Sequence, residues 1–294
     1  MEDVAEATAL GASISQAICF LISADRKDRN MAGKVEIQNI KTEHFEMKYF
    51  SFGHGRKTML IIPGVSVLSV MLSADAVAGA FNMFAEEYTV YLFDYRKNLP
   101  DYFGVEDMAG DLAEAMRALG LSNAYIMGTS HGGMIAQYLA VNNPELVSKM
   151  VIVSTLSRQN EVSRETFSEW VRLAEGGDRV LLNRDITNRV YGQAFHDRFL
   201  EVFKTQEESG TPEDIAKFRT LAESCLKMDI YDKLDRIKAP TMVIGAWQDH
   251  VLGWQGPYEL ARKLNCDLHI MKDFGHAIYD EYDKVRQMVY DFFV

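Results

Sequence analysis

The pentapeptide Gly128-Thr129-Ser130-His131-Gly132 is a G-x-S-x-G sequence that lies between an apolar, strand-like run and a helical pattern. In that context the motif predicts a sharp turn from strand to helix, which lifts the serine hydroxyl above the edge of a sheet. The turn strains its central residue, and side chains two positions before and after it would collide, so both positions favour glycine. We therefore predict that Ser130 is a nucleophile.

A serine hydroxyl needs a general base at neutral pH, and the chain offers seven histidines. We expect His276 to be the base, because it follows the last predicted strand, at the sheet edge where α/β proteins place their sites. The other histidines lie beside the nucleophile or the favoured acid, inside a strand, in the helical insertion or ahead of the third strand. These are His44, His54, His131, His196, His250 and His269.

The base needs a carboxylate that fixes its tautomer and stabilises the imidazolium. Asp249 follows the predicted strand 241–244 after a short loop, and we expect it to be this acid. Two alternatives stay open from the residues alone. Asp249 could be the N-cap of the next helix, and Asp94, which ends another strand, could be the acid although it precedes Ser130 in the chain.

Strands and helices alternate along most of the chain. Continuous apolar runs are typical of strands buried on both faces of a parallel sheet, and helical spacing separates them. The sequence therefore predicts an α/β fold with a mostly parallel central sheet and helices on both faces. The expected strands are 34–42, 45–52, 58–62, 88–93, 124–127, 150–153, 241–244 and 267–271, and the expected helices of this part are 106–119, 133–141 and 279–293.

The alternation is interrupted between about residues 158 and 233, where helical patterns occur without a convincing strand. We interpret this stretch as a helical cap or lid inserted into a core made of residues 34–157 and 234–294. Residues 1–33 contain apolar positions at helical spacing and are predicted to form an N-terminal helical extension. The expected lid helices are 164–174, 178–188, 193–204 and 211–228.

The order of nucleophile, acid and base, together with several motifs, resembles the α/β-hydrolase superfamily, in particular its lid-bearing, esterase-like serine hydrolases. The resemblance extends from about residue 35 to residue 294 and implies the same fold and a Ser-Asp-His triad. The matching pieces are IIPG at 61–64, FDYR at 93–96, GTSHGGMIAQYLA at 128–140, NPELVSKMVIVS at 143–154, IKAPTMVIGAWQD at 237–249 and FGHA at 274–277.

Two backbone N–H groups are candidates for an oxyanion hole. The turn places that of His131 at the start of a helix, where the partial positive charge of the helix stabilises an anion. The resemblance implies a second donor in the loop after the third strand, and by position this is Val65. Many relatives have His-Gly in that loop, whereas this chain has Pro63-Gly64.

Aromatic and large apolar side chains of the insertion are candidates for the substrate pocket, since a lid would cover the nucleophile. They favour small to medium hydrophobic esters over sugars or polyanions. The same helical spacing is also typical of ordinary packing, so both interpretations stay open. The candidates are Phe195, Phe199, Trp170, Tyr191 and Met228.

Composition narrows the classes of partner and location. The 294 residues carry a formal net charge of −11, which argues against binding to nucleic acid or to anionic lipid. No stretch is long and apolar enough for a membrane span. The three cysteines are far apart, which favours a reducing, cytoplasmic setting. We expect a small-molecule substrate and no metal or organic cofactor, and keep a homodimer as an alternative because the N-terminal helix could pack on a second subunit.

Other functions on the same fold remain as alternatives. A carbon–carbon bond hydrolase would use the same triad and lid, although such enzymes usually have Trp after the base, where this chain has Ala277. Peroxide could replace water at the acyl-enzyme, which would give perhydrolase activity. A small-molecule receptor with slow, single-turnover hydrolysis is the alternative that is not an enzyme. Multiple turnover separates an enzyme from such a receptor.

Overall fold

The computed structural model describes residues 34–294, and its centre is an eight-stranded sheet with the order β1-β2-β4-β3-β5-β6-β7-β8. Strand β2 is antiparallel to both of its neighbours, and all pairings from β4 to β8 are parallel. The strands are β1 (Gln38–Lys41), β2 (Glu46–Phe52), β3 (Lys57–Ile62), β4 (Tyr88–Arg96), β5 (Ala124–Thr129), β6 (Val147–Val153), β7 (Thr241–Ala246) and β8 (Asp267–Met271).

Helices cover both faces of the sheet, because alternate residues of the inner strands are apolar on both sides. In β3, Leu60 and Ile62 belong to one buried cluster, whereas Met59 and Ile61 belong to another. The predicted mostly parallel sheet with helices on both faces is therefore confirmed. The first cluster contains residues of α4 (Val105–Ala118), α5 (His131–Asn142) and α10 (Gln255–Leu264), and the second contains residues of α3 (Ala74–Ala80), α11 (Ile278–Glu281) and α12 (Lys284–Phe293).

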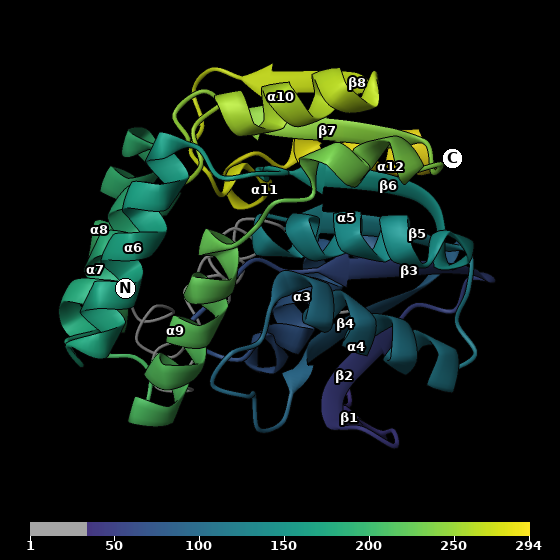
Figure 1. The fold of residues 1–294 in the computed structure, drawn as a ribbon, viewed down its shortest axis with the longest axis horizontal. Coiled ribbons are helices and arrows are strands. Elements are labelled where there is room, and N and C mark those ends of the chain that lie inside the picture. The colour runs from purple at the N-terminus through teal and green to yellow at the C-terminus, as the bar shows by residue number, and fades with distance from the viewer. Residues whose placement is uncertain (1–33) are drawn as a thin grey trace.

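Four helices lie between β6 and β7 in the sequence, and Figure 1 shows them gathered beside one end of the sheet. A single β-bridge between Arg158 and Asp229 joins the two ends of this segment. Three of the four have side-chain N-caps that satisfy backbone donors at their starts. The helices are α6 (Glu161–Glu175), α7 (Arg179–Val190), α8 (Gln193–Gln206) and α9 (Pro212–Leu226).

The structure differs from the sequence-based expectation in several elements. The helix predicted at 279–293 is broken, because Tyr282 has extended backbone angles (φ −131°, ψ 98°) between α11 and α12. Helix α3 is not among the expected helices, the helix after Asp249 is α10, and the first strand is shorter than predicted. Short 3₁₀ turns complete the chain: η1 (Val70–Ser73), η2 (Asn82–Phe84), η3 (Pro144–Leu146) and η4 (Tyr231–Arg236).

The helical extension predicted for residues 1–33 lies outside the described residues, so it stays a prediction. Within the part of the chain that the structure describes, no helix is long and apolar enough to cross a membrane.

Candidate active site

Ser130 stands at the turn between β5 and α5 with positive φ (φ 52°, ψ −120°), which is rare for a residue with a side chain. Its backbone is held on two sides. Its N–H donates to the carbonyl of Val153 at 2.9 Å, and its own carbonyl accepts the hydroxyl of Thr155 at 2.7 Å. The strained conformation predicted for the central serine is therefore present, and the last residue of β6 and Thr155, just beyond this strand, hold it in place.

The glycines of the motif are required by close backbone contacts. A Cβ atom on Gly132 would lie 2.0 Å from the carbonyl oxygen of Ile62, and one on Gly128 would lie 2.8 Å from the carbonyl oxygen of Gly132. Neither neighbour is a flexible side chain that could move away. The collision expected at both positions is thus a property of this turn.

Ser130, His276 and Asp249 are brought together at the carboxyl ends of their strands. The Ser130 Oγ lies 2.8 Å from His276 Nε2, and His276 Nδ1 lies 2.8 Å from Asp249 Oδ2. All three residues are buried. Because a carboxylate only accepts, Nδ1 carries the imidazole proton and Nε2 is left to accept the proton of the serine hydroxyl.

Asp249 also accepts two backbone hydrogen bonds through its other oxygen, from Val251 and Leu252 at 2.9 and 2.8 Å. Burial alone would raise the pKa of this carboxyl. The nearby His276 and the two N–H donors outweigh burial and hold the pKa of Asp249 below its usual value. The alternative interpretation of Asp249 as the N-cap of the next helix is wrong, because the N-cap of α10 is Trp254. The two N–H contacts of Asp249 are with its own loop, and its other oxygen contacts His276.

The other candidate acid, Asp94, has different partners. One of its oxygens accepts the ammonium of Lys217 on α9 at 2.9 Å, and the other accepts the hydroxyl of Ser69. It therefore joins the end of β4 to the loop after β3 and to the inserted helices. His276 has its carboxylate contact with Asp249 instead.

The two candidate oxyanion donors belong to backbone segments close to Ser130. A Cβ on Gly64 would lie 3.1 Å from the Cβ of Ser130, so the loop that carries Val65 passes close to the serine. His131 is the first residue of α5. No backbone hydrogen bond outside the regular elements of residues 34–294 uses the N–H of either Val65 or His131.

The imidazole of His131 is turned away from this site into the protein. Its Nδ1 lies 2.8 Å from the hydroxyl of Tyr95, and its Nε2 lies 3.1 Å from the hydroxyl of Ser224 on α9. Complete burial lowers the pKa of His131 to about 3, so the ring is neutral at physiological pH.

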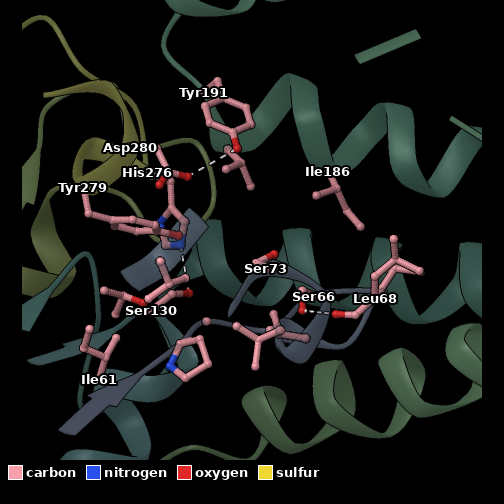
Figure 2. Close-up of a pocket in the computed structure, with 18 of the residues that line it drawn as sticks. Ile61, Ser66, Leu68, Ser73, Ser130, Ile186, Tyr191, His276, Tyr279 and Asp280 are labelled. Atoms are coloured by element: carbon pink, nitrogen blue, oxygen red, sulfur yellow. Dashed lines mark hydrogen bonds between the residues drawn. The ribbon is translucent and has the colours of Figure 1, made fainter. Parts of the chain in front are cut away.

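A cavity of about 210 Å³ opens onto Ser130 and His276, and Figure 2 shows several of the side chains that line it. Most of its wall is apolar. The loop after β3, helix α3 and the inserted helices all contribute. Two of the predicted pocket residues, Trp170 and Tyr191, lie in this lining.

The other three predicted pocket residues are absent from the lining, which corrects the expectation from the sequence. Phe199 is buried against Tyr191, and Phe195 stacks on the same tyrosine with ring centroids 5.2 Å apart. Met228 is buried in the main core. Their helical spacing reflects packing between helices, which was the other interpretation of the pattern.

Several lining residues were not identified from the sequence. Ile186, Thr187 and Val190 lie one helical turn apart or less on α7, a spacing that is typical of one helix face. Asp280 and Arg286 were also missed. The position of Asp280 four residues after His276 was a usable signal, because the loop that delivers the base must continue along the same cavity.

No group of three or more His, Cys, Asp or Glu residues in the described range 34–294 is arranged to hold a metal ion.

Comparison with known proteins supports the fold and adds sequence relatives. A family model described as the alpha/beta hydrolase fold matches residues 58–283. Proteins named "Putative carbamate hydrolase RutD" are similar in sequence. One from Rhizobium rhizogenes is 25% identical over 66% of this chain and 78% of its own length, and one from a Caulobacter strain is 28% identical over 72% and 83%.

Solved structures of low sequence identity have the same fold. An alpha/beta hydrolase from a deep-sea metagenome library aligns with a TM-score of 0.78 at 19% identity, over 87% of this chain and 97% of its own. An enol-lactonase from Burkholderia xenovorans aligns with a TM-score of 0.76 at 16% identity, over 87% and 99%. A thermophilic esterase from Thermogutta terrifontis aligns with a TM-score of 0.71 at 19% identity, over 89% and 98%.

Proposed function

The chain belongs to the α/β-hydrolase fold family, and we propose that it is a serine hydrolase that forms an acyl-enzyme on Ser130. The proposed substrate is a small to medium hydrophobic molecule with a carboxylic ester or a similar acyl bond. The observation that carries this proposal is the continuous chain of two 2.8 Å contacts from Ser130 through His276 to Asp249 at the wall of an apolar cavity.

In the proposed reaction the Ser130 oxygen attacks the acyl carbon while His276 Nε2 takes the serine proton. Asp249 stabilises the imidazolium that forms. His276 then gives this proton to the leaving alcohol. A water molecule attacks the acyl-enzyme, with His276 again as the base, and the products are the carboxylic acid and free Ser130.

The negative charge on the carbonyl oxygen needs donors that are already in place. We assign this role to the backbone N–H groups of Val65 and His131. One such donor typically contributes roughly 10²–10³ in rate. The N–H of His131 also lies at the start of α5, where the helix adds partial positive charge.

Residues 158–233 are proposed to act as the lid of this site. The cavity wall contains Trp170 of α6 together with Ile186 and Val190 of α7, which supports this role. An apolar wall selects for hydrophobic substrates. We assign Trp170 and Tyr191 to substrate binding.

A carbamate is the second candidate substrate, and it is favoured by the names of the sequence relatives. Carbamate itself has four heavy atoms, which is small for a cavity of about 210 Å³. The size of the cavity therefore favours a larger ester, including a carbamate ester, over free carbamate. Carbon–carbon bond hydrolysis, perhydrolysis and a receptor with slow single turnover use the same residues and remain alternatives to be tested.

Steady-state hydrolysis of p-nitrophenyl esters of increasing acyl length, measured beside Ser130→Ala, tests the proposal. We expect multiple turnovers that disappear in the variant, with a preferred chain length that reflects the cavity. A single burst equal to the enzyme concentration would favour the receptor. Unchanged hydrolysis in Ser130→Ala would refute the proposed nucleophile.

A further inference from the structure

Asp280 places a carboxyl group on the wall of an otherwise largely apolar cavity. It lies on the short helix α11, four residues after His276, and shares the cavity lining with Ser130 and His276. Figure 2 shows its carboxyl group on the same side of the cavity as the imidazole of His276, facing Tyr191. A carboxylate in such surroundings is costly unless something compensates its charge.

The neighbouring acid, Glu281, has a structural role in this loop. Its Oε1 accepts the backbone N–H groups of Gly192 and Gly275, both at 3.0 Å. These two bonds join the inserted helices to the loop that carries His276. Glu281 therefore holds two backbone groups through this one oxygen.

The negative charge of Asp280 is compensated much more weakly by the described residues. The one hydrogen bond assigned to its side chain comes from the hydroxyl of Tyr191, at a long 3.5 Å. Its carboxyl group has no ion pair within 4 Å among residues 34–294. Burial, the largest influence, and the nearby Glu281 together raise the pKa of Asp280 to about 7, although Arg286 and the hydroxyl of Tyr191 act in the opposite direction.

Arg286, which lines the same part of the cavity as Asp280, already has other partners. The guanidinium of Arg286 also lines the cavity, but it pairs with Asp283 and donates to the backbone carbonyl of Tyr279 at 3.1 Å. Two further carboxylates, Glu281 and Asp283, lie in this corner beside Asp280. Because Arg286 pairs with Asp283, Asp280 and Glu281 have no cation of their own among residues 34–294, and their ionised forms favour a positively charged ligand.

We propose that Asp280 is a specificity-determining residue that binds a protonated amine on the hydrophobic substrate, at the opposite end from the acyl group that Ser130 attacks. This inference rests on the proposed function, since it assigns the substrate class of the same cavity. A bound ammonium group would supply the charge partner that the carboxylate lacks among residues 34–294 and keep it ionised. The apolar wall would hold the carbon chain between the amine and the acyl group.

Binding to the Ser130→Ala protein tests the site without catalysis. Isothermal titration calorimetry compares hexylamine with 1-hexanol, which has the same carbon chain but no charge. We expect hexylamine to bind at least about 10-fold more tightly, and Asp280→Asn to abolish this difference. Asp273→Asn is the matched control, because it removes one exposed carboxylate from the same loop, outside the cavity lining.

Equal binding of the two ligands, binding of neither, or a preference that survives Asp280→Asn would overturn the inference. If Asp280→Asn does not fold, the comparison of the two ligands on the Ser130→Ala protein still decides the question. Thermal melting of each variant shows whether it is folded.

Kinetics on esters separates this inference from the proposed function. We expect p-nitrophenyl 6-aminohexanoate to have a lower KM than p-nitrophenyl hexanoate, and Asp280→Asn to raise the KM of the amino ester about 10-fold, so that the two esters are no longer distinguished. Amine binding without any ester hydrolysis would overturn the proposed function alone. Ester hydrolysis with no discrimination between the two esters would overturn the inference alone.

Discussion

The imidazole Nε2 of His131 lies 3.1 Å from the hydroxyl of Ser224, so the residue directly after the proposed nucleophile is bonded to helix α9. The other ring nitrogen lies 2.8 Å from the hydroxyl of Tyr95 at the end of β4. One buried side chain thus joins the strand-to-helix turn, the central sheet and the inserted helices. The position of the insertion and the geometry of the turn depend on the same contacts.

The low pKa of His131 predicts that the folded protein loses stability as the pH falls. The folded protein binds a proton at this ring only near pH 3, whereas an unfolded histidine binds one below about pH 6.5. The unfolded state therefore holds more protons in this interval, and stability falls as the pH drops. Urea unfolding should show His131→Asn losing less stability than wild type on acidification, by up to about 1.4 kcal/mol per pH unit. Parallel losses in both proteins would contradict the prediction.

Gly132, two residues after the nucleophile, predicts a large loss of stability when it is replaced. Gly132→Ala would place a Cβ 2.0 Å from the carbonyl oxygen of Ile62, and we expect it to lower the free energy of unfolding by about 3 kcal/mol or more. Gly110→Ala is the matched control on α4, where a Cβ meets nothing within 4 Å. It should be neutral or stabilise by about 0.5–1 kcal/mol. Chemical denaturation measures the free energy of unfolding of both variants. A Gly132→Ala protein as stable as wild type would refute the packing described for the turn.

The alternation of apolar strands and helical patterns was enough to predict the sheet and the helices on both its faces, because buried parallel strands leave continuous apolar runs. The residues of the proposed triad were also identified from the sequence, since a nucleophile turn and the ends of β7 and β8 have local signals. The side chains of the insertion were harder to assign. Phe199 and Trp170 are both aromatic residues within helical patterns, yet only Trp170 lines the cavity. Which face of each lid helix points inward is set by how the helices pack on one another, and local spacing does not contain that information.

The ion pair between Lys217 and Asp94 predicts measurable coupling between α9 and the core. The two side chains are 25% and 10% exposed, so solvent screens the pair less than it screens a surface pair. A double-mutant cycle with Lys217→Met and Asp94→Asn should give a coupling of about 1–3 kcal/mol.

The matched control for that cycle is the pair Lys204–Glu201 on α8, whose side chains are 53% and 83% exposed. Its coupling should stay below about 0.5 kcal/mol. Urea unfolding measures both cycles. Equal coupling in the two pairs would show that the contact of Lys217 with Asp94 does not hold α9 to the core.

The cavity predicts a dependence of acyl preference on helix α7. Ile186 lines the cavity, so Ile186→Trp should fill part of it, shorten the preferred acyl chain and slow the longest p-nitrophenyl esters by roughly 10-fold or more. Leu181→Trp is the control on the same helix, since Leu181 is 46% exposed and outside the lining. The kcat/KM values across the ester series measure the effect. An unchanged preference in Ile186→Trp would show that the acyl chain does not occupy this cavity.

The central claim is that His276 and Asp249 make Ser130 a nucleophile that becomes acylated. Labelling with a fluorophosphonate tests it most directly, because this reagent reacts with an activated serine and leaves a stable adduct. We predict one adduct per chain by intact mass spectrometry, assigned to Ser130 by peptide mapping, absent in Ser130→Ala and formed at least about 10²-fold more slowly in His276→Ala. An adduct on another residue, or labelling that is unchanged in His276→Ala, would contradict the account.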